Sequence, residues 1–159
     1  MTLQAPIAFF QRIIAVLERA QPLALLAARW YVAQVFFSSG LTKLRDWETT
    51  LALFSDEYKV PLLSPEVAAA AGTAGELVLP VLLALGLGGR FAALGLSVVN
   101  AVAVFSLAEI APAALQQHIL WACLLIGVLL WGPGRWSLDR FVLPWLQTTR
   151  HAAGYTRAA

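Results

Sequence analysis

Four long apolar stretches dominate this chain, and each has at least one strongly polar residue set inside it. The stretches run from Leu23 to Leu41, Val67 to Leu87, Phe91 to Leu107 and Ala113 to Trp131. Each approaches or exceeds the roughly 20 residues that a helix needs to cross the hydrocarbon core of a bilayer. The sequence therefore predicts an all-α membrane protein, an antiparallel bundle of four transmembrane helices with short amphipathic surface helices.

Composition excludes an ordinary soluble domain, because 60% of the 159 residues are hydrophobic and only 13% are charged. A soluble domain of this size could not hide so much apolar surface from water. We therefore expect contact with the lipid bilayer, and the net charge of +2 reflects membrane topology and implies no nucleic-acid partner. The single cysteine, Cys123, excludes an intramolecular disulfide and a cysteine-built metal site, and we expect no metal ligands.

Charged residues are divided between the two ends of the predicted spans. Arginines precede the first span, separate the second from the third and follow the fourth. The loop between the first two spans holds most of the acidic residues: Asp46, Glu48, Asp56, Glu57 and Glu66. Because positively charged loops remain in the cytoplasm, we expect both termini to be cytoplasmic.

Three regions follow from these patterns. Residues 1–20 predict an amphipathic helix on the membrane surface, because Ile7, Phe10 and Ile14 recur at helical spacing. Residues 21–132 form the predicted bundle, with a second interfacial helix in the loop between Arg45 and Pro65. Residues 133–159 predict an interfacial helix followed by a cytoplasmic tail.

Polar residues inside the spans are the main candidates for function. Ionisable side chains at the bilayer centre cost at least about 2.5 to 3.5 kcal/mol on insertion scales, so they face the bundle interior and mark functional or structural sites. In the first span, helical periodicity places five residues on one face: Arg29, Ala33, Phe36, Gly40 and Lys43. Counting helical rise brings Arg29 within about 5 to 7 Å of Glu76 along the membrane normal, which predicts an ion pair.

Each of these residues also has a structural interpretation. A pair between Arg29 and Glu76 could fix the order of the helices without any chemistry. Asn100 could join two helices by hydrogen bonds, and His118 could do the same or carry a proton. Trp121 lies one turn from His118 and could stack on a ligand or simply pack in the core. The sequence leaves these alternatives open.

Several segments together resemble the DoxX family. They are Arg29 to Lys43 with its Gly-x-x-Lys ending, Glu76 to Arg90 with its Gly-x-x-x-Arg ending, His118, and Gly132 to Asp139. The resemblance runs from about residue 20 to residue 140 and places Arg29, Gly40, Lys43, Glu76, Arg90 and His118 at family-like positions. It implies a four-helix protein of the bacterial inner membrane. Members are linked to quinone-coupled thiosulfate oxidation, to oxidoreductase complexes in oxidative-stress defence and to gene clusters for modified metal-binding peptides. This chain resembles most the members of the last group.

Two functional hypotheses follow. In the first, the chain is a redox-associated subunit that binds a membrane quinone: Glu76 and His118 handle protons, Arg29 or Lys43 polarises a quinone oxygen, and Asn100 and Trp121 add contacts. Bis-histidine haem is excluded because the second histidine, His151, lies in the tail. No cofactor is expected within the chain, so electrons would pass through the quinone or a partner oxidoreductase.

In the second hypothesis, the chain is a non-catalytic membrane scaffold or a small permease-like partner of a modified-peptide or metal-homeostasis system. A homo-oligomer could supply the second half of such a permease. The sequence leaves open whether the protein is an enzyme.

Overall fold

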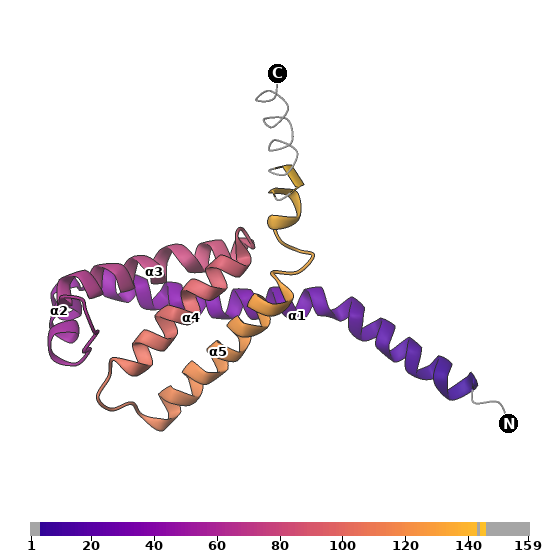
Figure 1. The fold of residues 1–159 in the computed structure, drawn as a ribbon, viewed down its shortest axis with the longest axis horizontal. Helices are drawn as coiled ribbons and strands as arrows, with labels where there is room; N and C mark the ends of the chain where they lie inside the picture. The colour runs from indigo at the N-terminus through magenta and orange to yellow at the C-terminus, as the bar shows by residue number, and fades with distance from the viewer. Residues whose placement is uncertain (1–3, 143, 146–159) are drawn as a thin grey trace, which may run out of the picture.

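The computed structural model describes residues 4–142 and 144–145, and the predicted tail from Thr148 to Ala159 lies outside them. Five helices make up this part of the chain: α1 (Gln4–Arg45), α2 (Trp47–Asp56), α3 (Pro65–Leu85), α4 (Gly89–Phe105) and α5 (Pro112–Trp131) (Figure 1). Residues 139–142 and 144–145 are also helical. Within the described residues the only β-type pairing is an isolated bridge between Tyr58 and Leu107. The predicted all-α class is confirmed for this part of the chain.

Helix α1 joins two segments that the sequence separates. It is 42 residues long and continues through Pro22, so the predicted surface helix and first span form one helix. At 1.5 Å per residue its length is about 63 Å, about twice the thickness of a bilayer core. Its N-terminal half extends away from the other helices in Figure 1, and its C-terminal half packs along α3. The apolar side chains of the free half, such as Phe10 and Leu17, are exposed.

The core lies between the C-terminal half of α1 and helices α3, α4 and α5. Its buried side chains come from all four helices: Val32 and Phe36, Leu83, Ala92, Ala93 and Leu96, and Leu125 and Val128. The face predicted for the first span is confirmed, since Arg29, Ala33, Phe36 and Gly40 are all buried. Helical periodicity therefore gave the correct inward face of α1.

Outside this core the molecule presents an apolar surface. Among the described residues two helices, α3 and α5, are long and apolar enough to cross a membrane, and the 17-residue α4 is a shorter apolar helix. Helix α5 is apolar on all sides, yet only Leu125 and Val128 are buried in it. An all-round apolar helix is normally covered by protein or by lipid, and here protein covers little of it. This arrangement is typical of a membrane protein in contact with lipid.

Helix α2 begins immediately beyond α1. It confirms the prediction of a helix between Arg45 and Pro65. The Asp46 carboxylate caps it by accepting hydrogen bonds from Thr49 N (3.1 Å) and Thr49 Oγ1 (2.7 Å). Thr50 Oγ1 donates to the carbonyl of Lys43 at 3.0 Å, which ties α2 to the last turn of α1. The chain therefore reverses direction at this point, and Phe54 packs on Ala68 and Ala69 of α3.

Gly40 sets the distance between α1 and α3. A Cβ at this position would lie 3.0 Å from the Leu77 side chain and 3.1 Å from the backbone carbonyl carbon of Glu76. Small residues allow membrane helices to approach this closely. The two backbones touch here because residue 40 has no side chain.

Replacing Gly40 with alanine should force α3 away from α1, because the Glu76 backbone cannot retreat without moving its helix. Overpacking of this kind costs about 1 to 3 kcal/mol, so we expect a lower unfolding temperature in detergent for Gly40→Ala. Gly127→Ala is the matched control, since its Cβ would meet only the Trp131 ring at an ordinary 3.7 Å. Equal unfolding temperatures for the two variants would contradict this account of the contact.

Candidate functional site

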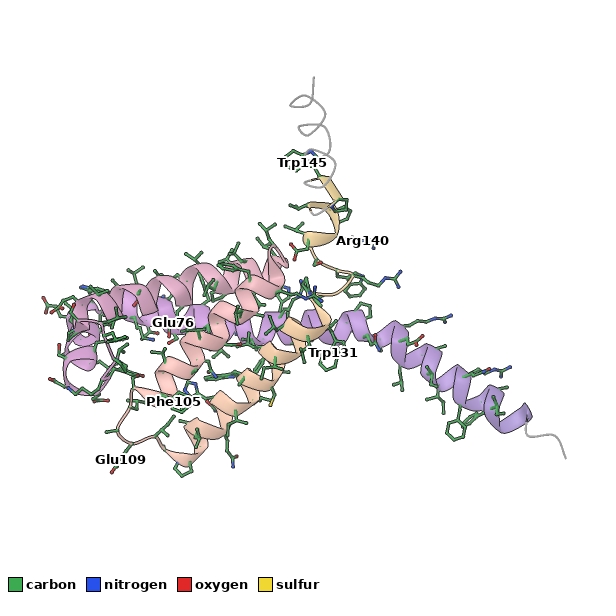
Figure 2. The ribbon with its side chains drawn as sticks, in the orientation of Figure 1. Glu76, Phe105, Glu109, Trp131, Arg140 and Trp145 are labelled. Atoms are coloured by element: carbon green, nitrogen blue, oxygen red, sulfur yellow. The ribbon has the colours of Figure 1, made fainter. Side chains whose placement is uncertain are left out.

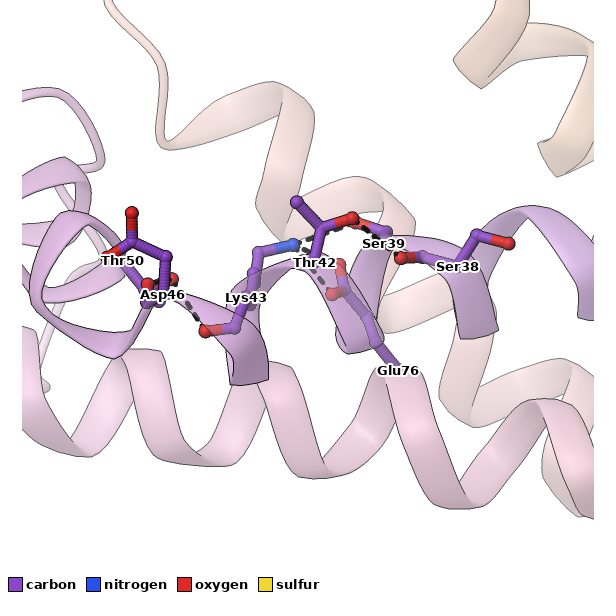
Figure 3. A network of polar contacts seen from close by, with 7 residues as sticks. All are labelled: Ser38, Ser39, Thr42, Lys43, Asp46, Thr50 and Glu76. Carbon is purple, nitrogen blue, oxygen red and sulfur yellow. Dashed lines mark hydrogen bonds and ion pairs between the residues drawn. The ribbon is translucent and has the colours of Figure 1, made fainter.

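Lys43 of α1 and Glu76 of α3 form an ion pair inside the bundle (Figure 3). Lys43 Nζ lies 2.6 Å from Oε2 and 2.8 Å from Oε1 of Glu76, and donates a third hydrogen bond to Ser39 Oγ at 2.9 Å. Their side chains are only 16% and 10% exposed. An ammonium group has three N–H donors, so every donor of Lys43 has a partner.

The predicted ion pair between Arg29 and Glu76 is wrong. Arg29 shares a helix face with Lys43, as predicted, but it lies opposite Gly86, where its Nη1 fills the space that a Cβ on residue 86 would occupy. Gly86 is about 15 Å from Glu76 along the axis of α3. Counting residues from assumed membrane edges misplaced α1 along its axis, because this helix begins far before the first apolar stretch.

Arg29 instead holds the segment that follows α5. It is fully buried, and its Nη2 donates to the carbonyl of Trp136 at 2.5 Å. Its Nε and Nη1 have no hydrogen-bond partner among the residues that the structure describes. Asp139 is the acidic group whose charge acts on it. This places Arg29, a predicted quinone contact, at the opposite end of the bundle from the Lys43–Glu76 pair.

A cavity of about 200 Å³ lies beside the ion pair, lined by Lys43, Glu76, Gly72, Phe54, Tyr58, Val98, Val99 and Val102 among others. It forms because α1 ends at Arg45, two residues past the pair, while α3 extends further to Pro65. Helix α2 covers the remaining part of α3, with the Phe54 ring against Gly72. Apart from the ion pair and a few hydroxyl groups, the walls are apolar.

Tyr58 follows α2 and is a second residue with a polar group in the lining of this cavity. Its ring stacks on Phe54, with centroids 4.9 Å apart and planes 27° from parallel. Burial raises the pKa of the Tyr58 phenol, and the negative charges of Glu76 and Glu57 raise it further. The hydroxyl therefore stays protonated as a donor, and the structure gives it no hydrogen-bond partner within the described chain. Sequence reasoning missed this residue, because a tyrosine near a membrane edge looks like an interfacial anchor.

Asn100 of α4 and His118 of α5 form a second polar cluster. Asn100 Nδ2 donates to the His118 carbonyl at 3.0 Å, and Asn100 Oδ1 lies 2.7 Å from His118 Nδ1. Because Oδ1 only accepts, this orientation of the amide assigns the proton to Nδ1 and leaves Nε2 of the neutral ring as an acceptor. Among the described residues Nε2 has no hydrogen-bond partner, so it is available to a ligand.

Trp121 joins the His118 cluster to the core. Its ring lies 4.8 Å from that of His118 and 5.6 Å from that of Phe36, both in edge-on geometry. The Trp121 Nε1–H is buried and has no partner in the described part of the chain. Asn100, His118 and Trp121 do not line the cavity beside Lys43 and Glu76. Of the six predicted site residues, therefore, two line the cavity, three form this cluster and Arg29 lies apart.

Acidic, histidine and cysteine side chains are the candidate metal ligands among the residues that the structure describes. No group of three or more of them that could hold a metal ion occurs within residues 4–142 and 144–145. The cavity lining supplies an ion pair and a phenol, and the cluster of Asn100 and His118 supplies an amide and an imidazole.

The DoxX family model matches residues 24–109, more than half of the chain. The chain belongs to the DoxX family. The matched segment contains Lys43, Glu76, Asn100 and all residues that line the cavity, whereas His118 lies beyond it. No curated protein and no solved structure matches the chain.

Lys43 and Glu76 should be energetically coupled, whereas Arg29 and Glu76 should not. Removing one member of a buried pair leaves an uncompensated charge and costs about 3 to 5 kcal/mol. We therefore expect Lys43→Met with Glu76→Gln to destabilise the protein less than the sum of the two single changes. Chemical denaturation in detergent measures all variants.

The control cycle pairs Arg29→Met with Glu76→Gln. Distant sites add within about 0.5 kcal/mol, so this double change should equal the sum of its parts. Coupling in the Arg29 cycle and additivity in the Lys43 cycle would restore the pair predicted from sequence.

Proposed function

We propose that this DoxX protein is a redox-associated subunit of the bacterial inner membrane that binds a membrane quinone beside Lys43 and Glu76. In this proposal the C-terminal half of α1 together with α3, α4 and α5 cross the membrane as four spans, with both termini in the cytoplasm. Family membership, the apolar outer surface and the distribution of arginines support it. A separate oxidoreductase would supply the electrons.

The observation that carries the proposal is the small apolar cavity whose lining includes the ion pair and Tyr58. Its volume of about 200 Å³ is below the roughly 300 to 1,000 Å³ of pockets for drug-sized molecules. That size suits a single substituted ring. The stacked Phe54 and Tyr58 rings offer a flat aromatic neighbour, and offset or edge-to-face ring contacts contribute about 0.5 to 1.5 kcal/mol.

The residues that line the cavity would have different roles toward a bound quinone. Tyr58 would donate its hydroxyl proton in a hydrogen bond to a ring oxygen, because this donor has no other partner in the described chain. Glu76 would hold or release a proton beside the Lys43 ammonium. The valines of α4 would keep water out, which strengthens both polar interactions. When bound, a quinone supplies the electron-accepting ring, which no side chain of this site provides.

A non-catalytic scaffold is the second candidate, and one observation favours it. All three N–H donors of Lys43 already have partners, two on Glu76 and one on Ser39. A closed pair of this kind can fix α1 against α3 without any ligand. The scaffold then presents its surface to a membrane or soluble partner, or to a second copy of the chain.

Filling the cavity should remove bound quinone. Ala103 lines the cavity, so Ala103→Phe places a ring in the space, and we expect the gently solubilised variant to copurify with less quinone than the parent. Tyr58→Phe keeps the stacked ring and removes one hydrogen bond, which should weaken binding by about 2- to 12-fold. Mass spectrometry of extracted lipids and titration with a water-soluble short-chain quinone measure the two effects.

The control is Ala84→Phe, which fills an apolar groove between α1 and α3 that is lined by Trp30, Phe37 and Pro80 and has no ionisable side chain. This variant should retain quinone at the parental level. Absence of quinone from the parent protein, or equal retention in all variants, would favour the scaffold.

His118→Gln asks whether the second cluster carries protons. The glutamine amide can still donate a hydrogen bond to Asn100 Oδ1, and the backbone carbonyl of residue 118 still accepts from Asn100 Nδ2, but the amide does not titrate near neutral pH. We expect this variant to fold normally and to lose quinone reduction in membranes at matched protein levels, whereas Trp121→Phe should preserve it. Full activity of His118→Gln would remove the proton-carrying role and leave Asn100 and His118 as a link between helices.

A further inference from the structure

A second, larger cavity lies at the other end of the molecule, where the turn between α3 and α4 meets the end of α5. Its volume is about 650 Å³, and its lining includes Arg90, Arg135, Arg140 and Asp139 together with the aromatic rings of Phe91 and Trp131. Figure 2 shows Trp131 and Arg140 at this end, away from Phe105 and Glu109 at the other. Nothing in the proposed quinone site uses these residues.

The walls of this cavity are fixed by hydrogen bonds. Arg29 holds the carbonyl of Trp136, while the backbone N–H groups of Leu138 and Asp139 donate to the carbonyls of Leu85 (3.1 Å) and Gly86 (3.0 Å). The Asp139 carboxylate accepts from the N–H groups of Gly88 (2.7 Å) and Gly89 (2.9 Å) at the start of α4. The segment after α5 is therefore held against the helix ends as a formed surface.

Positive charge dominates the lining, with three arginines against one aspartate. The aspartate is already engaged by the two backbone N–H groups. Arg90 donates to the carbonyls of Leu129 (3.1 Å) and Leu130 (3.3 Å) at the end of α5. The guanidinium groups of Arg135 and Arg140 make no hydrogen bond or ion pair with any residue in the described ranges, so their donors remain available to an anion.

Two exposed aromatic rings, Phe91 and Trp131, belong to the lining of this cavity, and Trp136 follows Arg135 in the chain. Phe91 is 67% exposed, Trp131 is 74% exposed and Trp136 is 56% exposed. Tryptophan is enriched where membrane helices reach the headgroup level. The cavity therefore combines positive charge with rings that favour the boundary between headgroups and acyl chains.

We propose that this cavity binds the headgroup of an anionic phospholipid of the inner leaflet. Basic pockets between transmembrane helices on the cytoplasmic side have the chemistry that recognises such headgroups. Arg135 and Arg140 contact the phosphate, Arg90 adds charge from the wall, and Phe91 and Trp131 lie beside the upper acyl chains. The choice of leaflet rests on the orientation proposed above, whereas binding itself does not.

The test uses the purified full-length chain in a mild non-ionic detergent, with dioleoyl phosphatidylglycerol or dioleoyl phosphatidylcholine added to the micelles. We expect phosphatidylglycerol to raise the unfolding temperature more than phosphatidylcholine, and native mass spectrometry to show a retained phosphatidylglycerol. In the double variant Arg135→Gln/Arg140→Gln, apparent affinity for phosphatidylglycerol should fall by roughly 30-fold, given the contribution of each arginine near a membrane surface. Both side chains are exposed, so the variant should fold.

The matched control is Arg12→Gln/Arg19→Gln, which removes the same charge from the exposed half of α1 and should retain the lipid. Equal loss in both double variants would mean diffuse attraction to a basic surface and would overturn the proposal. A further arm adds glycerol phosphate, and protection as strong as that given by the lipid would identify a soluble anion instead. The lipid experiments do not depend on quinone binding, so failure to find quinone in the protein would not change the outcomes expected for phosphatidylglycerol.

Discussion

Contact between the backbones of α1 and α3 at Gly40 is the constraint on which the candidate site depends. An unpaired ammonium or carboxylate inside an apolar bundle is costly, and a pair repays that cost only when the two groups meet with good geometry. Lys43 lies one turn beyond Gly40, and Glu76 precedes Leu77, the residue that Gly40 touches. Because residue 40 has no side chain, the Lys43 ammonium can therefore reach the Glu76 carboxylate. A wider separation would leave the carboxylate without its partner and the ammonium with only the Ser39 hydroxyl on its own helix.

The two ends of the bundle satisfy buried cations in different ways. Lys43 finds a carboxylate and a serine hydroxyl, which together meet all of its donors. Arg29 finds one carbonyl and the field of Asp139, and two of its donor nitrogens have no partner among the described residues. Asp139 in turn holds the N–H groups at the start of α4. The Lys43–Glu76 pair thus holds α1 against α3 at one end, while Arg29 and Asp139 hold the segment after α5 at the other. Only the Lys43–Glu76 pair borders the small apolar cavity.

The sequence predicts correctly which face of α1 points into the bundle, but it does not predict how α1 is placed along its own axis relative to α3. Intervals of three and four residues identify which side chains share a face, and Arg29, Ala33, Phe36 and Gly40 are buried as that rule requires. Periodicity carries no information on axial register, which was taken from the ends of the apolar stretch. Because α1 continues through Pro22, those ends were misleading and Arg29 was matched to Glu76 in place of Lys43. Tyr58 was missed because its position depends on how α2 folds back over α3, a tertiary feature without a local pattern.

Available donors and acceptors, more than charge, decide where chemistry can occur in this fold. The Lys43 ammonium is the most polar group at the cavity, yet all of its donors have partners, so its contribution to a ligand is mainly its field on Glu76. The Tyr58 hydroxyl, which burial and acidic neighbours keep protonated, still has a hydrogen bond to give. The His118 ring has its Nδ1 held by Asn100, and its Nε2 still has a lone pair to offer. Neither side chain is fully buried, so water or a ligand can satisfy it, whereas a fully buried donor without a partner in the described chain, such as the Trp121 Nε1–H, costs free energy. The phenol donor and the imidazole acceptor are therefore the groups that the proposed ligand would engage, whereas the ion pair alone requires none.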